Sequence, residues 1–174
     1  GIEETLQFAY TGVLSKPVFV SAIKEKVIEI KEKESGKNKD VAPQEENSLK
    51  GLHFLAAEDN EINAEILSEI LAVEGASCEV AENGKIVLER FMESEEGEFD
   101  AILMDVQMPV MNGYDATRAI RALDRKDANE IPIIAMTADA FSDDVRKAKE
   151  SGMNDHISKP VDIERLEAVL QRWI

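Results

Sequence analysis

The sequence has little that would suit a protein of the cell exterior or of a membrane. Its 174 residues include a single cysteine, Cys78, so no internal disulfide can form. No apolar run approaches the roughly 18 to 20 residues that cross a bilayer, and no signal peptide opens the chain. We therefore expect a soluble, cytoplasmic protein without membrane contact by this chain, in which Cys78 is a small buried hydrophobe within a strand.

Positive charge is also scarce. The chain has 20 basic and 36 acidic residues, which gives a formal net charge of −16. Nearly all of this acidic excess lies from Lys50 onward. An anionic surface disfavours nonspecific attraction to nucleic acid and to acidic lipid headgroups, so we expect no nucleic-acid partner for this chain.

A charged stretch divides the chain between residues 31 and 49. It has almost no large apolar side chains and includes Gly36 and Pro43, which is typical of a linker. From residue 50 to residue 174, short apolar runs alternate with amphipathic segments. The expected strands are 52–57, 76–81, 100–104, 132–136 and 154–157, and the expected helices are 60–73, 83–93, 112–124, 140–151 and 162–173. Such alternation predicts an α/β fold, a five-stranded parallel sheet that is doubly wound with helices on both faces.

Residues 1–30 contain a partial repeat of the C-terminal region. The segment 15–23 (SKPVFVSAI) aligns with 158–166 (SKPVDIERL) through four identities and matched apolar positions. Lys-Pro before a helix is also a common helix start, which is the alternative explanation. The repeat favours a strand and helix from the last unit of a preceding domain. Because a fragment of this size cannot bury a core alone, it should dock on the main domain, on another chain or on a partner.

Acidic residues follow two of the expected strands. Asp105 ends one apolar run, and Glu58 and Asp59 come directly after another. The carboxyl ends of parallel strands meet at one edge of the sheet, which is where ligands bind in open α/β folds. Three acids at this edge would need a cation. Alternatively, Glu58 and Asp59 could only stabilise the start of the helix at Asn60, since acids favour helix N-termini.

Residues 50–174 resemble the receiver domain of two-component response regulators and hybrid histidine kinases. The matching motifs are 57–60 (AEDN), 103–109 (LMDVQMP), 111–113 (MNG), 136–138 (MTA) and 156–160 (HISKP). The wording of 108–114 and 152–156 is most similar to receivers of hybrid sensor kinases. The resemblance implies a flavodoxin-like sheet with strand order 2-1-3-4-5 and a parent histidine kinase that could be membrane-anchored. It also implies that residues 1–30 are the tail of a preceding receiver-like domain.

The resemblance implies a role for each acid. Asp105 would be the nucleophile that accepts a phosphoryl group from a phosphohistidine. Asp59 and Asp105 would bind Mg²⁺ directly, and the main-chain carbonyl of Gln107 would supply a third oxygen. Glu58 stands where the family can have an aspartate and would act mainly through water.

Three further residues carry implied roles. Lys159 would pair with Asp105 and then with a phosphoryl oxygen, and its bond to Pro160 is expected to be cis. The hydroxyl of Thr137 would donate to the phosphate. His156 stands in place of the family's switching aromatic residue and would move inward when Thr137 is drawn to the phosphate. Taken singly, these would be a surface lysine, an ordinary strand threonine and a half-exposed strand histidine.

The expected function is that of a phosphoacceptor that promotes its own Mg²⁺-dependent phosphorylation and its dephosphorylation. The expected partner is a histidine kinase dimerisation domain or a histidine phosphotransfer protein. Helix 140–151, the last strand and helix 162–173 would form the output surface. His53, in the first strand, is expected to be a packed strand residue, because a phosphorylatable histidine belongs on an exposed helix face.

Three alternatives fit the sequence less well. A phosphatase of the haloacid dehalogenase type wants a second acid two residues after its nucleophile, where this chain has Gln107. A pseudo-receiver would bind partners without phosphorylation, but all the phosphorylation positions are present. A nucleotide-binding flavodoxin-like module would need a glycine-rich loop after the first strand, and none follows residue 57.

Overall fold

The computed structural model describes residues 48–139 and 143–174. The chain divides into two units, Gly1–Gln44 and Glu45–Ile174, and all the described residues belong to the second. The predicted repeat in residues 1–30 and nearly all of the predicted linker lie outside the described residues. The domain boundaries proposed from the sequence therefore stay predictions.

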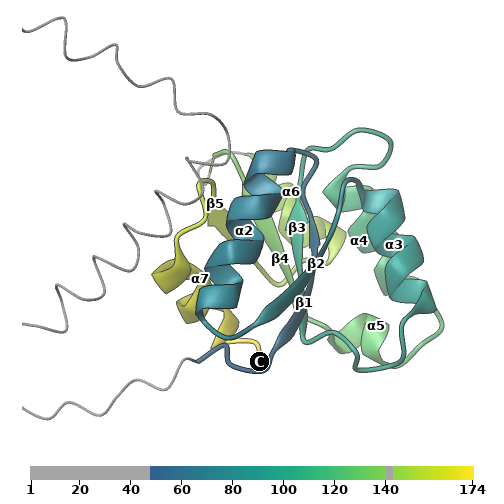
Figure 1. Ribbon diagram of the computed structural model, residues 1–174. Coiled ribbons are helices and arrows are strands. Elements are labelled where there is room, and N and C mark those ends of the chain that lie inside the picture. Colours follow the sequence, from purple (N-terminus) through teal and green to yellow (C-terminus); the bar gives the residue numbers. More distant parts are fainter. Residues whose placement is uncertain (1–47, 140–142) are drawn as a thin grey trace, which may run out of the picture. The chain divides into compact units, whose positions relative to one another are not determined.

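A five-stranded parallel sheet forms the centre of the described unit (Figure 1). Its strands are β1 His53–Ala57, β2 Ser77–Ala81, β3 Ala101–Asp105, β4 Ile133–Thr137 and β5 Asp155–Ser158. They pair in the order β2-β1-β3-β4-β5. The predicted strand order and the all-parallel pairing are confirmed.

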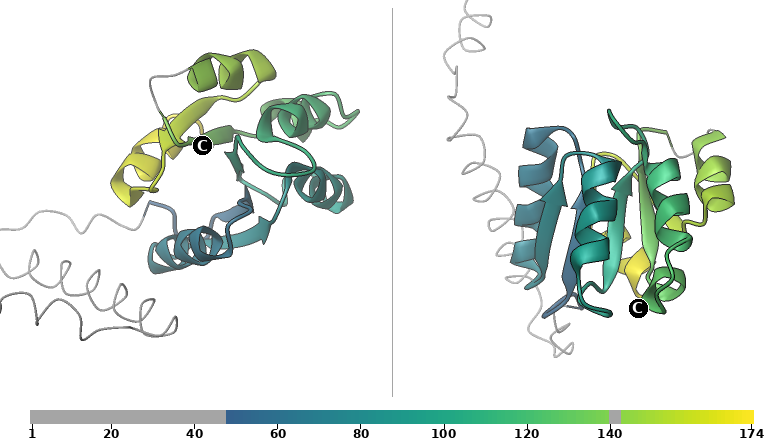
Figure 2. Two further views of the ribbon diagram at one scale, coloured as in Figure 1. Left: turned by 90° about the horizontal axis from the view of Figure 1, so that it is seen from above. Right: turned by 90° about the vertical axis from the view of Figure 1, so that its right-hand side faces the viewer.

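Helices connect the strands and cover both faces of the sheet (Figure 2). They are α2 Glu61–Val73, α3 Gly84–Glu93, α4 Gly113–Arg121, α5 Asp127–Glu130, α6 Asp143–Ser151 and α7 Ile163–Leu170. Helices α2 and α7 pack on one face, and α3, α4 and α6 pack on the other. The doubly wound prediction is confirmed. The short helix α5 was not predicted, and α4 and α7 each end three residues earlier than the sequence suggested.

Alternation along the strands explains the two cores. In β1, Phe54 and Ala56 face the side of α2 and α7, whereas Leu55 and Ala57 face the opposite helices. Strands β3 and β4 are buried at every position, which is why their sequences are continuous apolar runs. Each large side chain that is fully buried contributes about 1.5–3 kcal/mol to folding. The central strands therefore form the most rigid support for residues at their ends.

Asparagine caps set where three helices begin. The side chains of Asn60, Asn83 and Asn112 accept hydrogen bonds from the backbone N–H groups three residues on. All three caps were predicted. Each lies in the loop that leaves the carboxyl end of a strand, so the caps fix the loops at one edge of the sheet.

Two residues of the outer strands behave as ordinary strand residues. Cys78 is partly buried in β2, and burial raises the pKa of its thiol to about 12. His53 begins β1 and packs against Phe99, with the ring centroids 4.8 Å apart. Leu49, at the end of the predicted linker, is 1% exposed and belongs to the core. Within residues 48–139 and 143–174, no helix has the length and apolar character needed to cross a membrane.

Candidate active site

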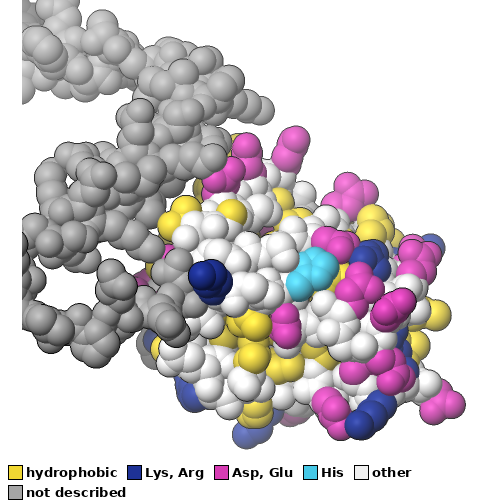
Figure 3. Space-filling model, turned by 60° about the horizontal axis from the view of Figure 1, so that its bottom comes forward, with side chains coloured by type: hydrophobic (Ala, Val, Ile, Leu, Met, Phe, Trp, Pro, Cys, Tyr) yellow, Lys and Arg dark blue, Asp and Glu magenta, His cyan; other side chains and the backbone are white. Residues whose placement is uncertain are grey.

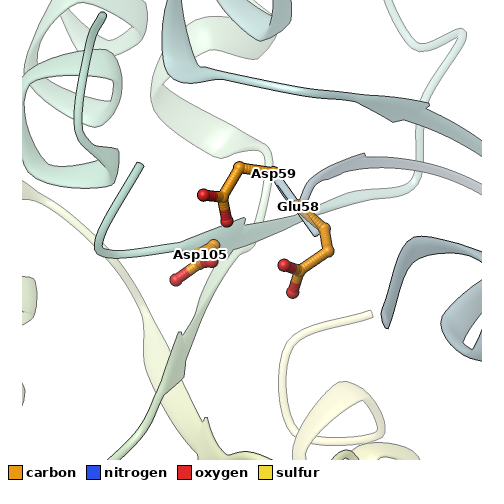
Figure 4. Close-up of side chains that lie close together, drawn as sticks. All are labelled: Glu58, Asp59 and Asp105. Carbon is orange, nitrogen blue, oxygen red and sulfur yellow. The ribbon is translucent and has the colours of Figure 1, made fainter. Parts of the chain in front are cut away.

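Three carboxylates meet at the carboxyl edge of the sheet (Figure 4). Glu58 and Asp59 follow the end of β1, and Asp105 is the last residue of β3. Each offers a carboxylate oxygen within 4.8 Å of the others. Glu58 and Asp105 are each 5% exposed, whereas Asp59 is exposed to solvent. The structure thus brings together the three acids that the sequence singled out.

Lys159 joins two of these acids. Its Nζ donates to Oδ2 of Asp105 and to Oε2 of Glu58, both at 2.7 Å. The other oxygen of Glu58, Oε1, accepts the backbone N–H of Asn60 at 3.0 Å. Lys159 directly follows β5, and its bond to Pro160 is cis, as expected. The lysine therefore points into the acidic cluster rather than out to solvent.

The charges of the cluster do not balance, because one ammonium faces three carboxylates. Burial raises the pKa of Asp105, although hydrogen bonds from Lys159 and from the N–H of Gln107 act in the opposite direction. Burial alone would lower the pKa of Lys159, but its hydrogen bonds to Asp105 and Glu58 raise it overall. Lys159 therefore stays charged at neutral pH, and the site still has room electrostatically for another cation.

The loop after β3 holds the nucleophile candidate from its backbone side. The N–H of Gln107 donates to Oδ1 of Asp105 at 3.2 Å, and the N–H of Gly113 donates to the carbonyl of Val106 at 3.1 Å. A Cβ atom on Gly113 would lie 2.2 Å from the backbone oxygen of Asp105. Only glycine fits there, so helix α4 begins in direct contact with Asp105. The sequence analysis noted Gly113 in a motif but missed this packing role.

Within the same loop, Val110 has the unusual backbone angle φ of +68°. The N–H of Met111 donates to the carbonyl of Pro109 at 2.7 Å across this residue, which makes a tight three-residue turn. The side chain of Val110 is 80% exposed. A β-branched residue in this region costs conformational energy, and such strain concentrates at functional sites.

Thr137 and His156 lie near the site without joining the acidic cluster. Thr137 ends β4 and is fully buried, and its hydroxyl donates to the carbonyl of Ile157 at 3.4 Å. His156 lies in β5 with its imidazole 27% exposed, and its Nδ1 is 3.8 Å from Oδ1 of Asp155. The contacts described for both residues are therefore with β5 itself. Their roles in switching stay predictions.

A cleft opens over the carboxylates. It is lined by Glu58, Asp59, Asn60, Asn63, Asp105, Val106, Gln107, Ala138 and Lys159. A neighbouring groove shares Glu58, Asn63 and Lys159 and is otherwise apolar, lined by Ile66, Leu67, Met136, Pro160 and Val161. Asn63 borders both hollows and was not singled out from the sequence. Its spacing of three residues from the helix cap Asn60 was the only available signal.

The comparison with protein families decides what this site belongs to. The model of the response regulator receiver domain matches residues 54–171. The chain belongs to the response regulator receiver family. This receiver is 38% identical over 122 residues to hybrid signal transduction histidine kinase I of Dictyostelium discoideum, a match that covers 69% of this chain and 7% of that protein. It is 34% identical over 127 residues to the sensor protein GacS of Pseudomonas syringae, covering 72% of this chain and 14% of that protein.

Solved receiver structures agree with this assignment. The receiver domain of the sensor histidine kinase PA1611 from Pseudomonas aeruginosa is 36% identical, with a TM-score of 0.64 over 71% of this chain and 97% of that one. Its description records a magnesium ion in the active site cleft. The receiver domain of Ssk1 from Saccharomyces cerevisiae, solved with the histidine phosphotransfer protein Ypd1, is 31% identical, with a TM-score of 0.62 over 72% of this chain and 90% of that one. The present receiver covers only a small fraction of the curated kinases.

Proposed function

We propose that this receiver takes a phosphoryl group from a phosphohistidine onto Asp105. One observation carries the assignment: Lys159 Nζ lies 2.7 Å from Asp105 Oδ2 beside a cleft with excess negative charge. A carboxylate oxygen of Asp105 attacks phosphorus, and the donor's N–P bond breaks as the new O–P bond forms. The leaving imidazole nitrogen keeps the electron pair and takes a proton from solvent. Lys159 remains charged and pairs with a phosphoryl oxygen.

The acidic cluster fits a magnesium ion. Carboxylate and carbonyl oxygens are the ligands that Mg²⁺ prefers, and the three side chains offer oxygens within 4.8 Å of one another. Asp59, Asp105 and the carbonyl of Gln107 would hold the ion directly. Glu58 would act through water, since both of its oxygens already have partners. When bound, the ion neutralises the negative charge of the phosphoryl oxygens.

Phosphorylation would then change the balance between two arrangements of the receiver. The new phosphoryl oxygens draw the hydroxyl of Thr137 away from the carbonyl of Ile157, and His156 moves inward beside it. The face made by α6, β5 and α7 would carry this change to a partner. The hollow between α6 and β5, which His156 borders, gives the imidazole room to move.

The phosphodonor is a histidine kinase dimerisation domain or a histidine phosphotransfer protein. The Ssk1 receiver solved with Ypd1 supports this class of partner, as do the hybrid kinases among the relatives. The apolar groove beside Lys159 and the exposed Ile62 on α2 offer contact area close to Asp105. We assign the chain to a cytoplasmic part of a hybrid sensor kinase, with residues 1–30 as the tail of a preceding receiver-like domain.

The direct test is the formation of the acyl phosphate. The protein is incubated with Mg²⁺ and acetyl phosphate, and an adduct that is stable in acid and labile in base is quantified by mass spectrometry. We expect the adduct in the wild type and in Asp124→Asn, which changes an exposed aspartate between α4 and α5. We expect none in Asp105→Asn. An equal adduct on Asp105→Asn would reject the assignment, and no adduct on the wild type would favour a pseudo-receiver.

A further inference from the structure

We propose that the carboxylate of Asp155 couples His156 to the turn formed by residues 171–174, so that phosphorylation of Asp105 changes the surroundings of Trp173. This inference rests on the proposed function. It adds a connection that leads from the carboxyl edge of the sheet to the residues after α7. We call Asp155, Arg172 and Trp173 the C-terminal clamp.

The two oxygens of Asp155 face different partners. Oδ1 accepts the backbone N–H of His156 at 2.9 Å and lies 3.8 Å from the Nδ1 atom of that histidine. Oδ2 accepts the indole N–H of Trp173 at 3.1 Å and lies 3.6 Å from a guanidinium nitrogen of Arg172. One rigid carboxylate group therefore touches both the switch histidine and the turn. A rotation of the group must alter both sets of contacts.

The clamp is built on rigid parts of the fold. Asp155 begins β5, and its side chain is only 16% exposed. The N–H groups of Trp173 and Ile174 both donate to the carbonyl of Leu170 at 2.9 Å. Leu170 is 1% exposed in the core, so the turn continues the end of α7. A change at Asp155 is therefore passed to the turn rather than lost in a loosely held segment.

The surroundings of Trp173 make the clamp sensitive. The indole is 45% exposed and the side chain of Arg172 is 63% exposed, so water competes with both of their contacts to Asp155. A small displacement of the carboxylate is enough to exchange these contacts for water. When His156 moves inward, Oδ1 loses its imidazole neighbour and the carboxylate reorients. The indole N–H then spends more time bonded to water.

Trp173 is the only tryptophan, so its indole N–H gives a single resonance in a nitrogen-15 correlation spectrum. The spectrum is recorded before and after adding Mg²⁺ and acetyl phosphate, and the adduct is quantified by mass spectrometry on the same samples. We expect the resonance to move in the wild type as the adduct forms. The shift, compared at equal adduct, should fall below half in Asp155→Asn and disappear in His156→Ala. Asp124→Asn should show the full shift.

The outcomes separate this inference from the proposed function. If no adduct forms on the wild type, the proposed function fails. If the adduct forms and the indole resonance does not move, the clamp is rejected. The clamp is also rejected if His156→Ala keeps the full shift at equal adduct. Dispersed backbone signals in each variant establish that it is folded, and Asp155→Ala gives a second variant in which a lost shift would support the clamp and a full shift would overturn it.

Discussion

The two edges of the sheet use charge in opposite ways. At the carboxyl edge, Lys159 alone faces three carboxylates, two of them buried. At the amino edge, arginines meet matched partners. Both ends of the Arg125 guanidinium donate to Asp127, at 2.6 and 2.8 Å. The same group donates to the carbonyl oxygens of Phe91 and Ser94, at the end of α3, and stacks on the Phe91 ring at 4.3 Å.

A second arginine at the amino edge repeats this balance. Arg90 donates to both oxygens of Glu79, at 2.7 and 3.0 Å, and also pairs with Glu98. On the face shown in Figure 3, which brings the lower side of the molecule forward, acidic and basic side chains lie beside one another. Planar arginine pairs with satisfied partners serve stability. A buried surplus of one charge costs stability and instead prepares a site for a ligand of opposite charge.

The largest effect should follow from removing the single cation of the carboxyl edge. Lys159→Met leaves the buried carboxylates of Glu58 and Asp105 unpaired, so we expect the free energy of unfolding to fall by about 3 kcal/mol. Phosphorylation by acetyl phosphate should slow on the order of 100-fold. Urea unfolding measures the first effect and adduct formation the second.

Magnesium makes this test sharper, because the ion can replace the missing positive charge. Adding Mg²⁺ should recover part of the lost stability of Lys159→Met. The control Lys149→Met changes an exposed lysine of α6 and should alter neither stability nor rate. If Mg²⁺ leaves the unfolding midpoint of Lys159→Met unchanged, the surplus carboxylates do not form an ion site.

Next in size is the backbone contact beneath Asp105. Gly113→Ala places a Cβ atom against the backbone oxygen of Asp105, so we expect a loss of about 2–3 kcal/mol together with slower phosphorylation. Gly97→Ala is the control. Gly97 has a φ of +81° but no atom within 4 Å of an added Cβ, so that change should cost about 1 kcal/mol and leave the rate unchanged. Equal losses in the two variants would contradict the packing role of Gly113.

At the amino edge, the expected loss is of stability alone. Arg125→Met leaves Asp127 and the carbonyl groups at the end of α3 without their donor, which should cost about 2 kcal/mol. The phosphorylation rate should be unchanged. Arg118→Met breaks an exposed ion pair with Asp115 and should cost only about 0.3 kcal/mol. A slower phosphorylation of Arg125→Met would show that the two edges are coupled.

The smallest effects concern acid, and the two edges should respond with opposite signs. The hydrogen bond from Arg125 lowers the pKa of Asp127, so this group stabilises the fold above its usual pKa of 3.8 and loses that effect as the pH falls. Burial raises the pKa of Asp105, so its contribution is fully present below 3.8 and is lost as the pH rises. Asp127→Asn should therefore be less stable than the wild type at pH 7, and Asp105→Asn more stable.

Both differences should shrink below pH 4. Urea unfolding of the two variants and the wild type at pH 7 and pH 3 measures them. A deficit of Asp127→Asn that persists at pH 3 would mean that the carboxylate charge is not what stabilises this contact.

The sequence predicted the elements whose signals are local. Strands β3 and β4 are buried on both sides, so their runs of apolar residues were unmistakable, and the asparagine caps lie where each helix begins. The position of Asp105 at a strand end followed directly. Helix α5 was missed because four charged or small residues, of which only Ala128 is buried, show no helical period.

Contacts between distant segments could not be predicted in the same way. The bond from Lys159 to Asp105 was expected from the family motif, but the equal bond to Glu58 depends on how two long side chains settle in the folded site. The contact of Gly113 with the backbone of Asp105 depends on the angle at which α4 meets β3. The clamp on Asp155 joins residues of β5 and of the turn after α7, and no local pattern announces it.

The burial of Leu49 has a practical consequence for anyone shortening this protein. Its side chain is as hidden as those at the centre of the sheet, and the N–H of Leu52 donates to its carbonyl at 3.1 Å. A truncated version starting at residue 50 would lose a piece of its own interior and about 2–5 kcal/mol of stability. An expression boundary placed a few positions upstream of Ser48 would keep that interior whole.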